Sequence, residues 1–533
     1  MIGSVRFFPL IFSLLPVALS AQGVNPADLL VAPSTSWPTY NGDYSGRRFS
    51  PLRQINTVNV QWMSLAWTSR FNARNAFGGV AIKSTPLLAN GILYFSAPSN
   101  VWAVDARTGR EEWHYEYPPS VGSTIGNRGL AMYGTWLFFE TPDSHLVSLD
   151  ARTGKERWRV EIADPKLDYT STVAPVVIGN HLLVGIGGDH LDNPGFLQSL
   201  DPETGAMQWK WLTTPRKGEA GIETWPSEYA SEHGTGQPWM PGTYDPGLNL
   251  YYFGTGNPNP VMAEKSRKGD NLYTCSIVAV NPDTGKLVWY YQASPHDVHD
   301  WDAVETPVLI DGVVDGKPRK LLAQASRNGF FFVLDRVTGE HILTKPFIDT
   351  LNWTAGLNAN GQPVANPAKY PTVDGVLVSP SAAGAANWQA PTFSPNTGLF
   401  YVGSDHAYSL FYLTDTSDAP EGWAGIDSVV DGSGGSLLAI DYRSGEIAWR
   451  HDWFRGSGIT SLLSTASNLL FASNERQFIA FDAVTGRILW HSYLAVNPTA
   501  GPISYVLDAQ QYILVAAGDS LYSFSLNMKA LGD

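Results

Sequence analysis

Three aspartates stand close together in the segment Pro295–Asp302, which reads Pro-His-Asp-Val-His-Asp-Trp-Asp. Asp297, Asp300 and Asp302 place three carboxylates within six residues. Asn257 follows a Gly-Thr-Gly turn, where backbone can approach a ligand closely. Oxygen donors of this kind suit a hard cation such as Ca²⁺. A solvated acidic loop with capping aspartates is the alternative.

The two histidines of the same segment, His296 and His299, are predicted to be structural. Zinc usually takes a tetrahedral set of Cys and His ligands, and no further cluster of these residues stands nearby. Cys275 is the only cysteine. A disulfide within the chain, a Cys-x-x-Cys zinc site and a Cys-x-x-Cys-His haem attachment are therefore excluded.

The composition indicates an acidic globular chain with many turns. In 533 residues, 35 Lys and Arg against 49 Asp and Glu give a formal net charge of −14. Nucleic-acid binding is disfavoured, because no basic face is available to neutralise phosphates. A 44% apolar content is too high for a disordered chain. The 51 Gly and 36 Pro favour turns over long helices. The 19 Trp are numerous enough to indicate a structural role that recurs along the chain.

The N-terminus has the pattern of a secretory signal peptide over residues 1–21. Arg6 precedes an apolar stretch, Phe7–Ala18, and the small-residue run Ala18–Ala21 follows. The stretch is shorter than the ~20 apolar residues of a membrane span, and no later segment is long and apolar enough to span a bilayer. We expect cleavage after Ala21, which leaves residues 22–533 as one exported domain; a buried N-terminal strand is the alternative.

One unit recurs along the chain: a small residue, an apolar residue, Asp-x-x-Thr-Gly or a close variant, and a Trp eight residues after the Asp. Its full copies are Ala103–Trp113, Ser148–Trp158, Ser199–Trp209, Ala279–Trp289, Ala439–Trp449 and Ala480–Trp490. A further copy, Asp335–Gly339, lacks the Trp. The motif predicts a tight turn between β-strands. The Trp is then expected to dock on a neighbouring sheet.

Stacked four-stranded sheets with one indole each predict an all-β fold, an eight-bladed β-propeller with tryptophan-docking repeats. Trp67 is expected to close the ring with the C-terminal strands. The long gap between Asp335 and Asp441 has room for an extra blade, marked by Pro391–Phe393 and Leu399–Val402.

With these repeats and four further motifs, the chain resembles the quinoprotein dehydrogenases, eight-bladed propellers that bind pyrroloquinoline quinone (PQQ). The motifs are Trp37–Asp43, Arg48–Leu52, Gly254–Pro258 and Pro295–Asp302. The repeats alone also resemble scaffold propellers of outer-membrane assembly. The last two motifs make the likeness specific, because the family keeps its chemistry there.

The resemblance implies that Asn257 and Asp300 flank a Ca²⁺ ion that also binds the quinone, with Asp300 as the base that removes the alcohol proton. Asp302 stands where lanthanide-using members place an extra carboxylate, but sugar-oxidising members also have an aspartate there. Asp302 is therefore expected either as a fourth ligand or as a residue beside the ligands. The metal-binding Glu of the family falls at His190, a poor ligand for a hard cation, so Asp189 would supply that carboxylate.

The resemblance also implies a set of PQQ contacts. Trp239, 18 residues before Asn257, matches the indole on which the flat quinone stacks. Arg128 would pair with the quinone carboxylates and Arg327 would donate to the quinone oxygens. The other positions implied to contact the cofactor are Thr172, Gly187, Gly188 and Asn387.

The chain departs from the family at several positions. Two adjacent cysteines over the quinone are replaced by Gly122 and Ser123, and a cofactor-contacting Glu is replaced by Lys83. A late Trp of the pocket has no counterpart in Gly456–Thr460. These changes bear on the substrate, the metal and the affinity for PQQ, not on the fold.

The function predicted is that of a periplasmic PQQ-dependent dehydrogenase that oxidises a small alcohol or a related hydroxyl compound. Asp300 would accept the hydroxyl proton while hydride passes to a quinone polarised by Ca²⁺ or a lanthanide. Electrons would leave through a separate cytochrome c or quinone, since one cysteine cannot attach a haem. The alternative is a non-catalytic or PQQ-lacking propeller that serves as a protein-binding scaffold.

Overall fold

Antiparallel strands make up most of the regular secondary structure of the chain. The computed structural model describes residues 26–75, 78–118, 126–167, 169–187, 192–431 and 434–527; the signal-peptide prediction for residues 1–21 lies outside them. The α-helix of these residues is α1 (Glu228–Glu232). The 3-10 turns are η1 (Pro26–Leu30), η2 (Val60–Trp62), η3 (Pro165–Leu167), η4 (Ile222–Thr224) and η5 (Pro367–Lys369). None of the helices described has the length and apolar character to cross a membrane.

Four-stranded antiparallel sheets follow one another along the chain. The sheets of the first half are β5–β8 (Leu87–Ala89, Ile92–Ala97, Asn100–Asp105, Glu111–Glu116), β9–β12 (Ala131–Tyr133, Trp136–Glu140, His145–Asp150, Glu156–Glu161), β13–β16 (Val176–Ile178, His181–Val184, Phe196–Leu200, Met207–Leu212) and β17–β20 (Thr243–Asp245, Leu250–Gly254, Ser276–Val280, Leu287–Gln292). Each is a meander whose neighbours in sequence are neighbours in the sheet.

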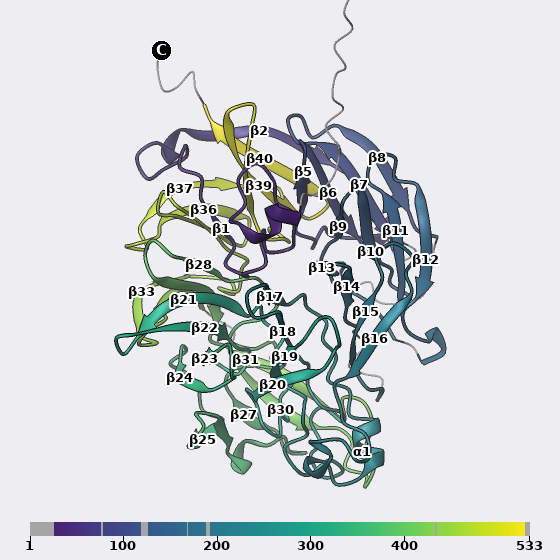
Figure 1. Ribbon diagram of the computed structural model, residues 1–533. Coiled ribbons are helices and arrows are strands. Elements are labelled where there is room, and N and C mark those ends of the chain that lie inside the picture. The colour runs from purple at the N-terminus through teal and green to yellow at the C-terminus, as the bar shows by residue number, and fades with distance from the viewer. Residues whose placement is uncertain are drawn as a thin grey trace, which may run out of the picture.

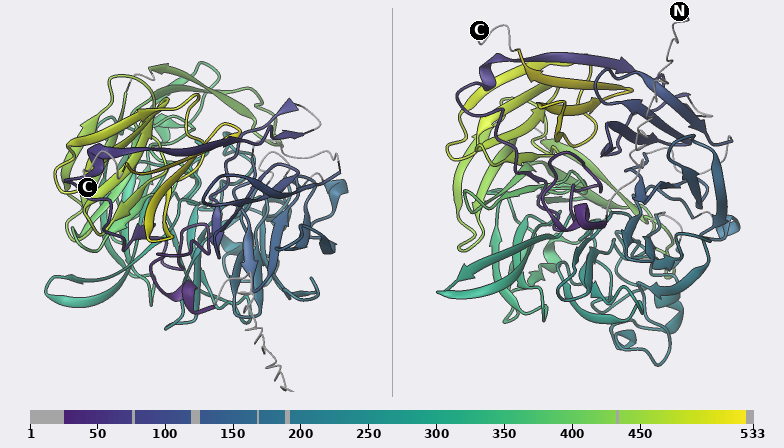
Figure 2. Two further views of the ribbon diagram at one scale, coloured as in Figure 1. Left: turned by 90° about the horizontal axis from the view of Figure 1, so that it is seen from above. Right: turned by 45° about the horizontal axis from the view of Figure 1, so that its top comes forward.

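The second half continues the same pattern. Its sheets are β21–β24 (Val308–Val314, Lys317–Ala325, Phe330–Asp335, His341–Pro346), β28-β29-β32-β33 (Thr392–Ser394, Leu399–Asp405, Gly435–Asp441, Ile447–Asp452) and β34–β37 (Leu463–Thr465, Leu469–Asn474, Gln477–Asp482, Ile488–Tyr493). Figures 1 and 2 show the sheets arranged around a common centre, which makes the fold an all-β propeller.

The two ends of the chain meet in one sheet. Strand β2 (Met63–Arg70) pairs antiparallel with β40 (Ser520–Leu526), beside β39 (Gln510–Ala517) and β38 (Ile503–Leu507). Figure 1 shows the purple β2 alongside the yellow β40. The predicted closure through Trp67 of β2 is confirmed. A second early strand, β1 (Phe49–Ser50), pairs parallel with β34.

The prediction of an extra blade between Asp335 and Asp441 is wrong. The two marked segments form β28 and β29, and β29 pairs with β32 of the repeat that ends at Trp449. They are therefore the inner strands of that repeat's own sheet. The remaining length forms small additions: β27-β30-β31 (Val376–Val378, Tyr408–Leu413, Gly425–Asp431) and β25-β26 (Thr354–Leu357, Pro363–Ala365). A further short pair, β3-β4 (Arg74–Asn75, Gly78–Gly79), follows β2.

Burial within a sheet falls from the inner strands to the outer strand. All residues of β7 except the last are buried, whereas β8 alternates between exposed and half-buried residues. An inner strand is covered on both faces, so its apolar residues run continuously. The outer strand carries Glu111, Glu112 and Glu116, and such charges disfavour pairing of the edge with another chain.

The Asp-x-x-Thr-Gly motif forms the predicted tight turn. In the first copy, Asp105 Oδ1 accepts hydrogen bonds from the backbone N–H of Arg107 (2.9 Å) and Thr108 (3.0 Å). Gly109 has a φ of 71°, a left-handed conformation that glycine adopts without strain. A Cβ at Gly109 would lie only 2.5 Å from Cε3 of Trp67. The glycine thus leaves room for an indole of the neighbouring sheet to rest on the turn.

The same docking recurs around the propeller. Indoles rest on turn glycines in the pairs Trp67–Gly109, Trp113–Gly154, Trp158–Gly205, Trp209–Gly285, Trp289–Gly339 and Trp449–Gly486. Indole N–H groups donate to carbonyls of the next sheet in the pairs Trp67–Ala106, Trp113–Ala151, Trp209–Pro282, Trp289–Arg336, Trp449–Ala483 and Trp490–Met63. The predicted docking of the repeat tryptophans is confirmed. Where the repeat lacks its Trp, side chains of Leu343 and Lys345 lie over Gly445.

We expect Trp113→Ala to lower the free energy of unfolding by roughly 3 kcal/mol, because it removes the ring against Gly154 and leaves a gap between two sheets. Urea unfolding measures the change. Trp62→Ala is the matched control, since Trp62 is 44% exposed, and its effect should stay within about 0.5 kcal/mol. Identical unfolding curves for the Trp113 variant and the wild type would show that the contact does not join the sheets.

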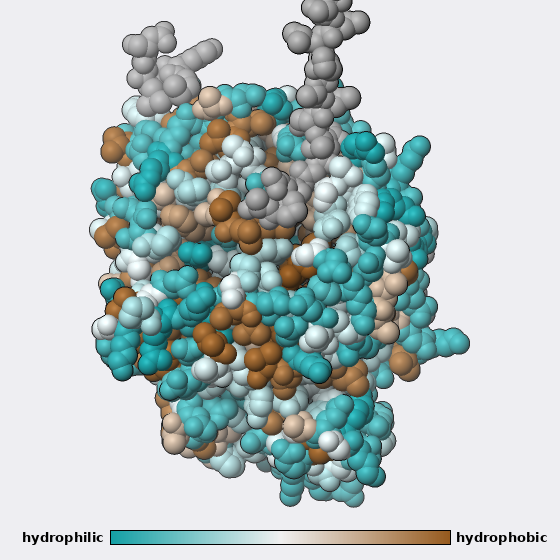
Figure 3. All heavy atoms as spheres, in the orientation of Figure 1, coloured by the Kyte–Doolittle hydropathy of each residue, from teal (hydrophilic) through white to brown (hydrophobic). Residues whose placement is uncertain are grey.

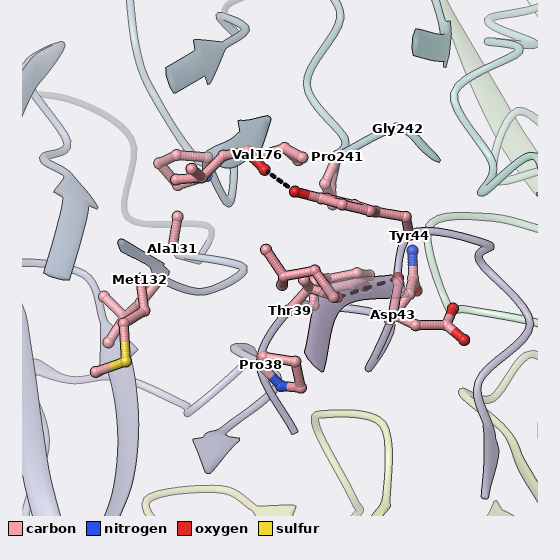
Figure 4. A pocket seen from close by; sticks show the side chains of 15 residues that line it. Pro38, Thr39, Asp43, Tyr44, Ala131, Met132, Val176, Pro241 and Gly242 are labelled. Atoms are coloured by element: carbon pink, nitrogen blue, oxygen red, sulfur yellow. Dashed lines mark hydrogen bonds between the residues drawn. The ribbon is translucent and has the colours of Figure 1, made fainter. Parts of the chain in front are cut away.

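The segment before β1 crosses the inner ends of several sheets. Arg48 is fully buried and donates to the carbonyls of Tyr40 (2.6 Å), Leu462 (3.0 Å) and Pro502 (2.8 Å). It therefore joins the N-terminal segment to the last sheets of the chain. Figure 4 shows the hydroxyl of Tyr44, which donates to the Val177 carbonyl at 2.6 Å.

The outer surface carries both hydrophobic and hydrophilic residues. On the face in Figure 3, hydrophobic residues lie in small groups among hydrophilic ones. The most exposed large hydrophobic side chain of the described residues is Phe454, at 93%.

Candidate active site

The acidic segment forms a buried loop between β20 and β21. Asp297 Oδ2 accepts hydrogen bonds from the backbone N–H of His299 (3.3 Å), Asp300 (2.9 Å) and Trp301 (3.1 Å), so this side chain shapes the loop. Burial raises the pKa of Asp297 to about 6. Asp300 follows with a φ of 69°, a left-handed conformation that Asp and Asn tolerate better than most residues. The loop, rather than a strand, orients the Asp300 carboxyl.

One arginine joins two of the aspartates. Arg327, from the turn between β22 and β23, donates from Nη2 to Asp300 Oδ2 and from Nη1 to Asp302 Oδ2, each at 2.8 Å. Its Nη2 also donates to the Ala382 carbonyl at 2.6 Å. The three side chains are 7%, 7% and 2% exposed. Two carboxylates and one guanidinium leave one net negative charge in a nearly dry site.

Asp302 connects this group to Asn257 and Trp239. Its Oδ1 accepts from the Asn257 backbone N–H at 2.6 Å, and its Oδ2 accepts from the Trp239 indole N–H at 2.8 Å. The close approach depends on glycine, because a Cβ at Gly254 would overlap the Ala303 carbonyl. Both carboxylate oxygens of Asp302 therefore have donors within the protein. This arrangement favours a residue that orients its neighbours.

Arg128 packs against the aromatic rings of Trp239 and Trp388. Its guanidinium carbon is 4.5 Å from the Trp239 ring centroid and 5.3 Å from that of Trp388. Arg128 is 4% exposed, and burial lowers its pKa to about 10. Its Nη1 donates to the Thr172 carbonyl at 3.4 Å, and its buried Nε has no hydrogen-bond partner. Across the described ranges, no carboxylate forms an ion pair with Arg128.

Two further residues predicted to contact the cofactor, Gly187 and Asn387, lie within the described part of the chain. Gly187 forms a β-bridge with Thr170, its N–H donating to the Thr170 carbonyl at 2.9 Å. Asn387 is half-buried and its Nδ2 donates to the Ala383 carbonyl at 2.7 Å. It lies next in sequence to Trp388, and thus near Arg128. The predicted positions Gly188 and Asp189, and the departures at Gly122, Ser123 and His190, lie outside the described residues.

The structure brings two predicted carboxylate ligands together, not three. Asp300 and Asp302 both accept hydrogen bonds from Arg327, and Asp302 also accepts one from the Asn257 backbone N–H. Among the described residues, no group of three or more His, Cys, Asp or Glu is placed to hold one ion. The oxygen donors present still match the preference of a hard cation, and the third carboxylate expected, Asp189, is not described.

Both histidines of the loop are held in structural contacts. His299 stacks on Trp301 with ring centroids 4.3 Å apart, and its Nε2 is 2.8 Å from the Lys369 carbonyl. Burial lowers the pKa of His299 to about 4. His296 Nδ1 lies 2.6 Å from the Gly269 carbonyl. These contacts leave the histidines in the roles that the sequence predicts.

Glu305 is a buried acid beside this site that the sequence analysis missed. It is 2% exposed, and the Ser326 hydroxyl reaches its Oε2 at 3.5 Å. Burial raises the pKa of Glu305 to about 8, although Arg327 opposes the rise. Glu305 follows Ala303 and Val304, so in the sequence it resembles a residue at the start of a β-strand. The only sequence signal for a functional position is its closeness to Asp302.

Glu305 should make the stability of the protein depend on pH. Its ordinary pKa is 4.5 and its folded pKa is about 8, so between these values the folded state keeps a proton that the unfolded chain loses. The free energy of unfolding therefore falls as pH rises, by about 1.4 kcal/mol per pH unit from this group. Glu305→Gln removes the titration, so its stability relative to the wild type should increase across this window. Urea unfolding at a series of pH values measures the difference, and parallel curves would contradict the assignment.

A cavity of about 490 Å³ opens beside Trp388. Its lining includes Lys83, Trp388 and the small residues Gly456, Ser457 and Thr460. The pocket in Figure 4 is about 20 Å³, which holds little more than one water molecule. The cavity beside Trp388 therefore has room for a substrate; another of about 440 Å³, lined by Asn90, Arg107 and Asp508, lies among other residues.

The chain matches the family described as "PQQ: Glucose/ethanol/alcohol dehydrogenase, beta-propeller domain" over residues 37–345 and 429–513. It is 35% identical over 509 residues to quinoprotein alcohol dehydrogenase PedH of Pseudomonas putida, covering 89% of this chain and 84% of the relative. The solved structures similar to this chain include two enzymes. One is the quinohemoprotein alcohol dehydrogenase ADHIIG of Pseudomonas putida HK5, with a TM-score of 0.87 and 31% identity over 95% of this chain and 82% of that one. The other is a europium-containing methanol dehydrogenase, with a TM-score of 0.81 and 29% identity over 92% of this chain and 98% of that one.

Proposed function

The chain belongs to the PQQ family of glucose, ethanol and alcohol dehydrogenases with a β-propeller domain, and we propose that it oxidises a small alcohol or a related hydroxyl compound with PQQ as cofactor. The observation that carries the proposal is the line of contacts from Arg128 through Trp239 to Asp302 and Asp300. It places a buried cation, an aromatic face and two carboxylates next to one another.

PQQ fits the residues at the Arg128 end of this line. A buried guanidinium without a carboxylate partner is costly, and PQQ carries three carboxylates on a flat ring. Among the described residues Arg128 has no carboxylate partner and its Nε has no hydrogen-bond partner, so an anionic planar cofactor would satisfy it. We assign cofactor contacts to Arg128, Thr172, Gly187, Gly188, Trp239, Arg327 and Asn387.

A hard cation fits the donors at the other end. The Asn257 amide and the carboxylates of Asp300 and Asp302 are oxygen donors, with one net negative charge after Arg327 is counted. We propose Asn257, Asp300 and Asp189 as ligands of Ca²⁺ or a lanthanide, with Asp302 either as a fourth ligand or as the side chain that orients them. The europium in the similar methanol dehydrogenase supports a cation of this class.

The proposed chemistry of the chain centres on a proton. When bound, PQQ would supply the two-electron acceptor for the alcohol and the cation would act as a Lewis acid. Asp300 would accept the hydroxyl proton on its carboxylate as the general base. Arg327 fixes the Asp300 carboxylate through Oδ2, and the loop shaped by Asp297 fixes its backbone. Burial of the site excludes water around this proton transfer.

We further propose the organisation around this site. Each four-stranded sheet is one blade of an eight-bladed propeller, which occupies residues 22–533 as a single domain after a signal peptide of residues 1–21. The protein works in the periplasm and passes electrons to a separate cytochrome c or quinone. A scaffold without cofactor is disfavoured, because it has no use for a buried Arg128 that forms no ion pair within the described ranges.

The test is reconstitution. Purified protein is incubated with PQQ and either Ca²⁺ or La³⁺, and dye-linked oxidation is followed with a series of primary alcohols. Turnover that requires both PQQ and the cation is the expected result. Protein that binds PQQ and a cation but oxidises no hydroxyl compound would contradict the proposed activity.

A further inference from the structure

Lys83 stands at the wall of the 490 Å³ cavity and has no role in the site described so far. It lies between β4 and β5, and its aliphatic stem packs over Gly126, where a Cβ would come within 2.7 Å of Lys83 Cδ. The side chain is half-buried. The packed stem limits where the ammonium group can lie.

Lys83 and Arg128 are neighbouring cations, and neither forms an ion pair with an acid in the part of the chain that the structure describes. The positive charge of Arg128 lowers the pKa of Lys83, as burial does to a greater extent. No described acid lies within ion-pair distance of either side chain. Glu475 also lines the cavity, but it is exposed and forms no ion pair with Lys83. Two like charges held together in a partly dry environment repel each other unless an anion lies between them.

The surroundings favour a small carboxylate as that anion. Trp388 lines the cavity and its ring centroid is 5.3 Å from the Arg128 guanidinium carbon, so the buried arginine lies behind this part of the lining. Two amide oxygens of lining residues, Gln389 Oε1 and Asn474 Oδ1, are buried and have no hydrogen-bond partner among the described residues. A net charge of −14 disfavours large polyanions. A small organic acid therefore matches the two cations and the size of the cavity.

We propose that Lys83 and Arg128 together form a carboxylate-binding site at the inner wall of this cavity. The inference rests on the proposed function, since Arg128 is also the residue assigned to the cofactor. The bound carboxylate belongs to one of two molecules: to PQQ, or to a small hydroxy acid that enters the cavity. In the first case Lys83 is a cofactor ligand; in the second it selects acidic substrates.

The experiment compares Lys83→Met, which keeps the length of the stem and removes the charge, with Lys83→Arg, which keeps the charge. Lys317→Met is the matched control, because Lys317 is an exposed lysine on β22. PQQ affinity is measured by titration calorimetry in the presence of Ca²⁺. Binding of sodium lactate is measured as a shift of the melting temperature, with and without PQQ. All four proteins are first melted without ligand to establish that they fold.

If the carboxylate is that of PQQ, Lys83→Met should weaken PQQ binding about tenfold or more, as expected for a lost charge-assisted hydrogen bond. Lys83→Arg and Lys317→Met should bind as the wild type does. If the carboxylate is that of a free acid, PQQ affinity should be unchanged and only the lactate shift should vanish in Lys83→Met. Either result supports the site and identifies its source.

Unchanged binding of both PQQ and lactate in Lys83→Met would overturn the inference, even if the enzyme is active. A lactate shift that depends on Lys83, in a wild type that binds no PQQ, would support the carboxylate site and contradict the proposed function. The two claims therefore fail separately.

Discussion

Asp300→Asn should abolish alcohol oxidation without unfolding the protein. Asn keeps an oxygen that can accept from Arg327 Nη2, and it tolerates the positive φ of 69° at this position. It cannot take up a proton, so kcat should fall by about 10²–10⁴-fold. Dye-linked assays with variant and wild type at equal PQQ occupancy measure the effect.

The matched control for Asp300 is Asp374→Asn, which changes an exposed aspartate in the same way. Its kcat should equal that of the wild type. A PQQ-loaded Asp300→Asn variant with wild-type kcat would show that another group accepts the proton, and the base would have to be sought elsewhere in the loop.

Removal of the metal should have an effect of similar size, and Asp302 should set the affinity for the ion. Chelation of the purified protein is expected to abolish activity, with Ca²⁺ and La³⁺ each restoring it. La³⁺ should support activity at least as well as Ca²⁺, because an excess of negative charge attracts the trivalent ion more strongly. Calorimetric titration of each ion into chelated protein gives the affinities.

Asp302→Asn separates charge from hydrogen bonding at this site. The amide keeps an oxygen that can accept from Asn257 or Trp239 and removes one negative charge. We expect the affinity for La³⁺ to fall about tenfold or more, and that for Ca²⁺ to fall less. Unchanged affinity for both ions would mean that the charge of Asp302 is fully balanced by Arg327 and does not act on the metal.

The repeat could be predicted from the sequence because its parts are local. Asp105, Thr108 and Gly109 form their turn with one another, and the Trp eight residues after the aspartate reaches only the next sheet. The extra blade was predicted wrongly for the same reason. Strands β28 and β29 are local signals, but their partner β32 begins at Gly435, after the small sheet β27-β30-β31.

The contacts between the side chains of the site could not be predicted from the local sequence pattern. Trp239 and Asp302 are 63 residues apart, and Arg327 and Asp300 are 27 apart, so only the closed fold brings them into contact. The resemblance to quinoproteins placed these residues at one site but not the stacking of Arg128 on Trp239. Glu305 carried no signal of its own, since its burial and raised pKa arise from side chains of other strands.

The most direct test of the account is the equilibrium binding of PQQ to purified protein. Protein reconstituted with PQQ and Ca²⁺, then separated from free PQQ by gel filtration, should retain one PQQ per chain by its absorption spectrum. Retention of no PQQ by folded protein, with Ca²⁺ or with La³⁺, would contradict the central claim that this propeller is a PQQ-dependent dehydrogenase.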